Sequence, residues 1–327
     1  MLPPAAAIWL DSPMREIADG ILQLTFPMPL GLDHVHCYLL RRPSGGWLLV
    51  DTGLGTTDWE ERWANVVESL DAPIERILIT HYHPDHVGGA GDAQHATGAE
   101  VLQGAHDHAM MLDIWANDDY TRRAYDLFRA HGVPESVAGE IFANIEGLRP
   151  LIRYVRDVTP LEPGDLVDGW EVLRFGGHAD GHIALLRGDI LVGGDNLLME
   201  ITPNIGFSVG GDPDPLGTYF ATLARIEALA PRLVLPGHGP VVEDSVARCR
   251  ETVAHHDERL RRTLAALDRA EPRSGYEVSL TLWDYELAPI HRRFAVQEAV
   301  AHLERLVLDG RARRISADSG VVTYTAV

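Results

Sequence analysis

The stretch Thr80-His81-Tyr82-His83-Pro84-Asp85-His86-Val87-Gly88-Gly89 holds four potential metal ligands directly after an apolar run typical of a buried strand. Imidazole and carboxylate groups suit borderline divalent ions such as zinc. His81 and His83 stand two apart in an extended segment, so their side chains point the same way. Asp85 and His86 lie on the turn that follows and can face a second ion. One loop therefore predicts two adjacent metal sites.

Three further candidate ligands stand far along the chain in one shared context, the end of an apolar strand pattern beside a glycine-bearing turn. They are His178 in Gly176-Gly177-His178, Asp195 in Gly193-Gly194-Asp195, and His238 in Pro236-Gly237-His238-Gly239. A strand end is where an α/β scaffold presents chemistry, and a zinc site usually needs ligands from distant strands. The sequence thus offers enough donors to complete both sites.

The ordered series, HxHxDH followed by a lone His, a lone Asp and a lone His, resembles the metallo-β-lactamase-fold hydrolase superfamily over residues 15–245. The resemblance implies an α/β fold, a four-layer αββα sandwich. It also implies that two divalent ions bind per chain, zinc in the first place, with iron or manganese as alternatives. The implied ligands are His81, His83 and His178 for one ion and Asp85, His86 and His238 for the other, with Asp195 as the bridge.

Four more residues are candidates for supporting the ligands or contacting substrate. Asp51, in the Asp51-Thr52-Gly53 turn, is expected to orient the ligand loop. His182 follows His178 by four residues, in a position where the family commonly has a second His. His36 enters a strand near the expected mouth of the site. Asn204 belongs to Thr202-Pro203-Asn204-Ile205, which resembles a subgroup of glyoxalase II-like and β-lactamase-like hydrolases with a winged-helix tail.

The chain pattern predicts a catalytic domain over residues 1–245 and a C-terminal module over residues 246–327. Short apolar runs bounded by Gly, Pro or Asp predict strands at 22–26, 36–40, 46–50, 76–80, 170–175, 183–186, 190–192 and 233–235. Helical spacing predicts helices at 58–70, 244–269 and 293–308, and a helical insert at 106–153. A hairpin at 314–315 and 321–325, turning at Asp318-Ser319-Gly320, completes a winged-helix-like tail. Six apolar residues of the insert are expected to form an acyl-binding wall: Met110, Met111, Trp115, Tyr120, Tyr125 and Phe128.

Composition narrows the function of these 327 residues. The formal charge is −20, and none of the 28 basic residues is a lysine, which excludes Schiff-base and P-loop chemistry. Residues 1–245 hold 36 acidic residues against 15 arginines, whereas residues 246–327 hold 12 against 13. The acidic catalytic part disfavours nucleic acid as a partner.

Cys37 and Cys249 are too few and too far apart for a disulfide framework, which favours a reducing compartment. The apolar run Pro3 to Leu10 has no basic residue before it, and no stretch approaches the length of a membrane span. We therefore expect a cytoplasmic protein with no membrane partner. The arginine clusters at 291–293 and 311–314 are interpreted as a solvated or intersubunit face, which leaves a homodimer open.

The expected activity is hydrolysis of a small ester or thioester, a small-molecule acyl substrate, by a hydroxide that bridges two ions about 3.5–4 Å apart. Asp85 would orient this hydroxide and carry a proton to the leaving group. The motif alone leaves other activities open, since the fold hosts many. They are phosphodiester or RNA cleavage, lactone or β-lactam hydrolysis, and a non-catalytic metal-binding regulator, which the complete ligand series disfavours.

Overall fold

The computed structural model describes residues 14–30, 32–316 and 320–327. The apolar run Pro3 to Leu10 and the predicted turn residues Asp318 and Ser319 lie outside these ranges. Among the described residues, no helix combines the length and apolar character that a membrane crossing requires.

Two β-sheets form the centre of the fold. The first has the order β1-β2-β3-β4-β5-β6-β7, antiparallel from β1 to β4 and parallel from β4 to β7. Its strands are β1 (Arg15–Ala18), β2 (Ile21–Leu30), β3 (Leu32–Arg41), β4 (Trp47–Val50), β5 (Ile74–Ile79), β6 (Glu100–Gly104) and β7 (Thr159–Leu161). The second has the order β12-β11-β10-β9-β8, built from β8 (Leu166–Val167), β9 (Trp170–Arg174), β10 (Ile183–Arg187), β11 (Ile190–Gly194) and β12 (Leu233–Pro236).

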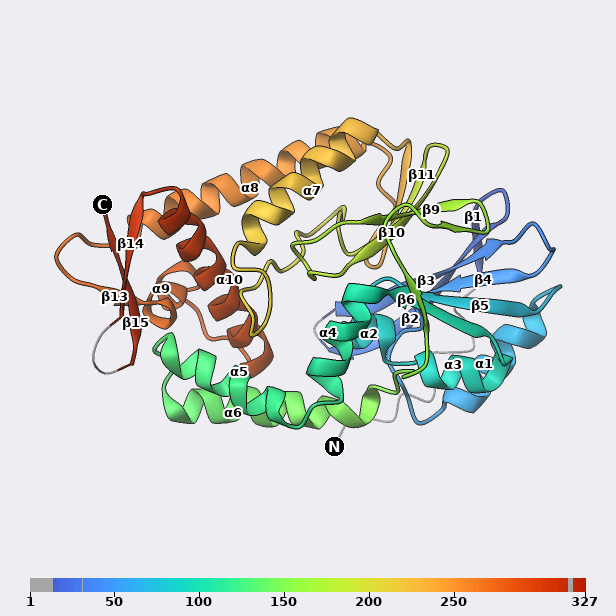
Figure 1. Ribbon diagram of the computed structural model, residues 1–327, viewed down its shortest axis with the longest axis horizontal. Helices are drawn as coiled ribbons and strands as arrows, with labels where there is room; N and C mark the ends of the chain where they lie inside the picture. The colour runs from blue at the N-terminus through green and yellow to red at the C-terminus, as the bar shows by residue number, and fades with distance from the viewer. Residues whose placement is uncertain (1–13, 31, 317–319) are drawn as a thin grey trace.

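Alternation along the strands places the two sheets face to face. In β3, Tyr38 and Leu40 point into the core between the sheets, whereas Cys37 and Leu39 point to the opposite face. The opposite face of the first sheet packs against α1 (Trp59–Ser69), α3 (Ala90–Thr97) and α4 (Ala105–Trp115). The outer face of the second sheet is covered by α7 (Pro215–Leu229) and α8 (Ser245–Ala265) (Figure 1). This arrangement of helix, sheet, sheet and helix confirms the predicted four-layer α/β sandwich.

The insert and the C-terminal segment pack on each other beside the sandwich. The insert consists of α4, α5 (Asp119–Ala130), α6 (Glu135–Leu148) and the 3₁₀ turn Arg149–Leu151, which matches the predicted bounds to within two residues. The C-terminal segment contains α9 (Gly275–Leu282), α10 (Pro289–Leu308) and the sheet β13-β15-β14 (Arg273–Ser274, Val322–Ala326, Ala312–Ser316). Phe128, Ile141 and Phe142 of the insert share an apolar cluster with Val296 and Val300 of α10 (Figure 1).

Several sequence-based bounds need correction. The strands predicted at 22–26 and 36–40 are the inner parts of a longer β2–β3 hairpin, so His36 lies inside β3 rather than at its start. The predicted helix 244–269 ends at Ala265, and the predicted helix 293–308 begins four residues earlier at Pro289, which suits the first turn of a helix. Helices α7 and α9 were not predicted, although both carry N-cap signals. Asp214 accepts from Gly217 N before α7, and Ser274 and Glu277 form a capping box at α9.

Candidate metal centre

Three histidines converge at the end of β5. The strand delivers His81 at its carboxyl end, His83 stands before the short helix α2 (Pro84–Val87), and His178 lies in the loop between β9 and β10. The Nδ1 atom of His83 lies 2.9 Å from His81 Nε2 and 2.9 Å from His178 Nε2. Three imidazole nitrogens thus face one point, which is the donor geometry of one metal site.

A second group of ligand atoms lies beside the first. Asp85 and His86 sit on α2, and His238 follows β12, with its Nε2 3.2 Å from Asp85 Oδ2. Asp195, which follows β11, places Oδ2 3.3 Å from His238 Nε2, 3.4 Å from His86 Nε2 and 3.6 Å from His178 Nε2. This oxygen therefore lies within reach of both groups, in the place predicted for a bridging ligand.

Several of these atoms are buried and lack a hydrogen-bond partner among the described residues, namely His86 Nε2, His238 Nε2 and Asp195 Oδ1. Buried polar atoms of native proteins are normally paired, because an unpaired one costs about 1–3 kcal/mol. A divalent cation between the imidazole and carboxylate groups would satisfy all three atoms. The residues present therefore fit two metal ions.

The remote nitrogens of the candidate ligands are held by the surrounding protein, as metal-binding histidines require. The pairs are His81 Nδ1 with Thr80 Oγ1 at 3.0 Å, His86 Nδ1 with Asp51 Oδ2 at 2.7 Å, His178 Nδ1 with the Asn204 carbonyl at 2.9 Å, and His238 Nδ1 with the His34 carbonyl at 2.7 Å. Each pairing fixes the ring orientation and leaves the other nitrogen facing the centre.

Electrostatics divide the cluster into two halves. Burial holds the pKa values of His81, His83 and His178 below the ordinary histidine value, so these rings are neutral and have lone pairs available for a cation. Burial would also lower the pKa of His238, but the carboxylates of Asp195 and Asp85 raise it to about 10. Burial alone would raise the pKa of Asp85, but His86 and His238 lower it to about 2. The carboxylates of the cluster are therefore ionised at neutral pH.

Asp51, which directly follows the neighbouring strand β4, anchors the ligand loop. Its Oδ1 accepts the Thr80 backbone N–H at 2.8 Å, and its Oδ2 accepts the Thr80 hydroxyl at 2.8 Å and contacts His86. The Asp51 backbone adopts a φ of 60°, a left-handed conformation in which Asp is one of the more tolerated residues. These hydrogen bonds hold the start of the ligand loop, and Asp51 is 2% exposed.

The remaining three candidates hold parts of the centre through hydrogen bonds and ring contacts. His36 contacts Thr25 Oγ1 and the Gly239 carbonyl, each at 3.0 Å, so it fixes the loop that carries His238. His182 is fully buried, stacks on the His81 ring and accepts the Asp195 backbone N–H at 3.2 Å. Asn204 offers its carbonyl to His178 and directs its amide to the Phe294 carbonyl of α10.

Sequence reasoning missed the residues that hold the middle of the ligand loop. Asp107 in α4 accepts the Tyr82 backbone N–H at 3.3 Å, and Trp115 Nε1 donates to the Tyr82 carbonyl at 2.9 Å. Both come from the insert, and neither stands in a recognisable motif. Trp115 was predicted only as part of an apolar wall, so its hydrogen bond to the loop is a finding of the structure.

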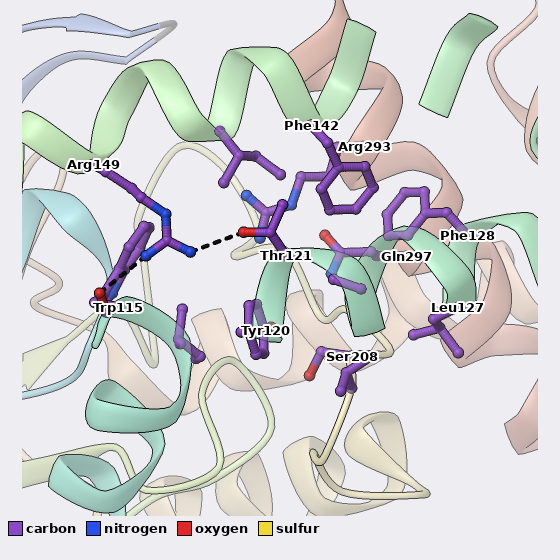
Figure 2. Close-up of a pocket in the computed structure, with 14 residues that line it drawn as sticks. Trp115, Tyr120, Thr121, Leu127, Phe128, Phe142, Arg149, Ser208, Arg293 and Gln297 are labelled. Carbon is purple, nitrogen blue, oxygen red and sulfur yellow. Dashed lines mark hydrogen bonds between the residues drawn. The ribbon is translucent and has the colours of Figure 1, made fainter. Parts of the chain in front are cut away.

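The predicted apolar wall is only partly formed. Trp115, Tyr120 and Phe128 line a hollow between the insert and α10, hereafter the insert hollow (Figure 2). Met110 and Met111 pack instead against the core beneath the first sheet, and Tyr125 packs on Phe142.

Comparison with known protein families agrees with this geometry. Residues 30–238 match the metallo-beta-lactamase superfamily model, and residues 260–327 match the metallo-beta-lactamase-like C-terminal domain. The chain therefore belongs to the metallo-beta-lactamase superfamily, a superfamily of metal-dependent hydrolases.

Individual relatives carry general names. The chain is 31% identical over 228 residues to the lactamase-like protein adaB of Aspergillus niger, a match that covers 69% of this chain and 56% of adaB. It is 28% identical over 238 residues to the probable metallo-hydrolase YqjP of Bacillus subtilis, covering 68% of this chain and 72% of YqjP. The chain thus spans little more than half the length of adaB.

Two solved structures share the whole architecture. A metallo-beta-lactamase family protein of Thermus thermophilus, TTHA1429, superposes with a TM-score of 0.83 at 31% identity, covering 95% of this chain and 100% of that one. A beta-lactamase domain protein of Burkholderia ambifaria superposes with a TM-score of 0.85 at 28% identity, covering 100% of this chain and 98% of that one. The insert and the C-terminal segment are therefore part of an arrangement seen in other members.

Proposed function

We propose that the protein is a dinuclear metal-dependent hydrolase of small esters or thioesters. The observation that carries this proposal is the convergence of seven ligand side chains into two groups that meet at Asp195 Oδ2. His81, His83 and His178 would hold one ion, Asp85, His86 and His238 the other, and Asp195 both. When bound, such ions would lower the pKa of a water molecule and polarise the acyl oxygen of the substrate. We propose zinc in the first place, with iron or manganese as alternatives.

Asp85 is the ligand-group carboxylate best placed to handle a proton. Its side chain is 18% exposed, against 8% for Asp195, and its Oδ2 faces His238 at 3.2 Å. An ionised carboxylate at this edge can accept a hydrogen bond from the attacking water, orient it, and return the proton to the departing oxygen or sulfur. Asp195 is enclosed by three imidazoles and is better suited to fixing the spacing of the two groups.

The preference for an acyl substrate rests on charge and on the insert hollow. Residues 1–245 carry 36 acidic residues against 15 arginines, which repels a polyanion such as RNA. The insert hollow is lined in part by the aromatic side chains of Trp115, Tyr120 and Phe128, of which Trp115 is hydrogen-bonded to the ligand loop. Such a surface favours the carbon skeleton of a small acyl group over a sugar-phosphate backbone.

The proposal is tested with p-nitrophenyl esters and thioesters assayed beside bis(p-nitrophenyl) phosphate, with and without a chelator. We expect chelator-sensitive turnover of the acyl substrates. Phosphodiester turnover without acyl turnover would refute the acyl assignment. The variant Asp195→Ala should lower metal stoichiometry together with rate, and an Asp195→Ala protein with two ions and full activity would contradict the bridging role.

Other features of the chain stay predictions. The tail has the helices and the hairpin of a winged-helix-like module, and we propose that assignment together with the domain division at residue 245. Cys37 and Cys249 are both buried and free, in agreement with the reducing cytoplasmic compartment expected from the sequence. A homodimer also stays a prediction.

A further inference from the structure

A further group of potential metal ligands lies between the helices α8 and α10. His255 and His256 come from α8 and Glu298 from α10, and each of the three side chains places one potential ligand atom within 4.8 Å of the others. We call these three residues the helix-pair cluster. Two imidazoles and one carboxylate form a donor set that zinc binds in proteins, with water as the fourth ligand.

The helix-pair cluster is largely withdrawn from water. His256 is 0% exposed, the Glu298 side chain is 14% exposed, and His255 is half-buried. Acidic and imidazole groups often gather on a protein surface without an ion, because water solvates each of them. That explanation does not serve for a group enclosed between two packed helices, where polar atoms need partners.

The hydrogen bonds behind His256 fix which of its nitrogens carries the proton. Burial lowers the pKa of His256 to about 2 and that of His302 to about 4, so both rings are neutral. His302 Nδ1 lies 2.7 Å from the Glu298 carbonyl, which can only accept, so this nitrogen is the donor and His302 Nε2 has a lone pair. His256 Nδ1 lies 3.3 Å from that Nε2 and is therefore protonated as well.

His256 Nε2 is consequently left with a lone pair. This atom is buried and has no hydrogen-bond partner among the described residues. A ring whose one nitrogen donates to the protein while the other offers an unused lone pair is the arrangement found in metal-binding histidines. The same relation holds for the candidate ligands of the metal centre, where His86 Nε2 and His238 Nε2 are the unpartnered atoms.

The Glu298 carboxylate also has capacity to spare. Its Oε1 lies 3.4 Å from Arg259 Nη1 and its Oε2 lies 3.5 Å from Asn204 Nδ2. Both contacts are longer than the roughly 2.7–2.9 Å of a charge-assisted hydrogen bond between nitrogen and oxygen. An ion could therefore take one oxygen while Arg259 keeps the other. Because the Arg259 charge opposes a cation, we expect weaker binding here than at the metal centre.

We propose that His255, His256 and Glu298 bind an additional divalent ion, zinc in the first place, which cross-links α8 to α10. This ion is separate from those of the metal centre, and the inference does not depend on the ester or thioester activity. Asn204 lies between the two places, with its carbonyl 2.9 Å from His178 Nδ1 and its amide beside Glu298. An ion that fixes Glu298 would therefore also steady the residue that orients His178.

The test counts zinc ions per chain after equilibrium dialysis at a buffered free zinc concentration, followed by elemental analysis. His255→Ala and Glu298→Gln should each bind one ion fewer than the wild type, because each removes one of the three protein ligands. His256 is kept, since its fully buried ring also supports the packing of α8 on α10. In crystals of the wild type with zinc, an anomalous difference map at the zinc edge should show a peak between the three side chains.

Two control variants should keep the metal content of the wild type. His291→Ala removes an exposed histidine of α10 and accounts for zinc held loosely at the surface. Thr202→Val removes the hydroxyl that lies 3.4 Å from His255 Nε2 and keeps all three ligands, so it separates ligand loss from disturbance of the 202–204 segment.

The inference is wrong if His255→Ala or Glu298→Gln retains the wild-type metal content, as it would if a water molecule occupied the cluster. It is equally wrong if Thr202→Val loses the same ion, or if the anomalous map has no peak at the cluster. If no ester or thioester is hydrolysed but the two ligand variants each lose one ion and the controls lose none, the proposed activity fails and the additional metal site stands.

Discussion

Replacing Asp51 with Asn isolates the effect of a residue that touches the metal ligands without being one of them. In the native protein, Asp51 Oδ1 accepts the Thr80 backbone N–H, and Oδ2 lies 2.7 Å from His86 Nδ1. An asparagine keeps the shape and one oxygen, which the Thr80 N–H retains. Its amide nitrogen then faces His86 Nδ1 and forces the ring to carry its proton on Nε2. That nitrogen is the one aimed at Asp85 and Asp195.

The magnitude follows from the contact that is lost. A hydrogen bond between an imidazole and a buried carboxylate contributes about 1.5–3 kcal/mol, which corresponds to about 10- to 100-fold in a binding constant. Loss of a partner behind a metal-binding histidine has effects of about the same size. We expect Asp51→Asn to weaken the ion at Asp85, His86 and His238 by this factor and to affect the other ion less. Competition with a chromophoric zinc chelator measures both constants.

Asp92→Asn provides the control for this experiment. Asp92 is also a buried aspartate, with both carboxylate oxygens 2.8 Å from Arg153. Among the described residues, no hydrogen bond or ion pair joins it to a candidate ligand. Both variants should retain the circular dichroism spectrum of the wild type. The reasoning is refuted if Asp51→Asn binds both ions with wild-type affinity, or if Asp92→Asn loses metal affinity to the same extent.

Three further predictions concern metal removal, backbone space and acid. Chelation should lower the melting temperature, because ions present at a thousand times their Kd add about 4 kcal/mol to stability; an unchanged melting curve would contradict two tightly held ions. Gly237→Ala should abolish metal binding, because a Cβ there would lie 2.7 Å from His86 Cε1 and closer still to Asp195 Oδ1, and equilibrium dialysis against zinc measures the loss. Burial lowers the pKa values of His131 and His302 to about 4, so both side chains are harder to protonate in the folded state than in the unfolded state. The free energy of unfolding that they contribute is therefore complete above pH 6.5 and is lost as the pH falls towards 4. Each contributes about 3 kcal/mol at most, and His131→Gln should flatten the decline in denaturant melts between pH 7 and pH 5.

The ligand series could be predicted from sequence because its geometry is local at each position. His81 and His83 point one way because successive residues of an extended segment alternate sides, whatever the rest of the chain does. His178, Asp195 and His238 each follow a buried strand, and the strand ends of a sheet present their loops at a common edge. The two sheets were predictable for a similar reason, since alternation and turn residues are visible within each segment.

Long-range packing set the roles of the supporting residues. From the sequence, His36 and His182 could either support the ligands or contact substrate. In the structure, His36 is paired with the Gly239 carbonyl and His182 with the Asp195 backbone N–H, and neither partner is near in the chain.

Arg293 shows the difference most clearly. In the sequence it belongs to a cluster of basic residues that is typical of a solvated surface. Only the packing of α10 against the insert places its side chain at the wall of the insert hollow. The sequence by itself therefore determined the metal chemistry, because the ligands follow local backbone periodicity. Only the tertiary structure decided which side chains surround the metal ligands. Those contacts form only when segments that are far apart in the chain pack together and exclude water.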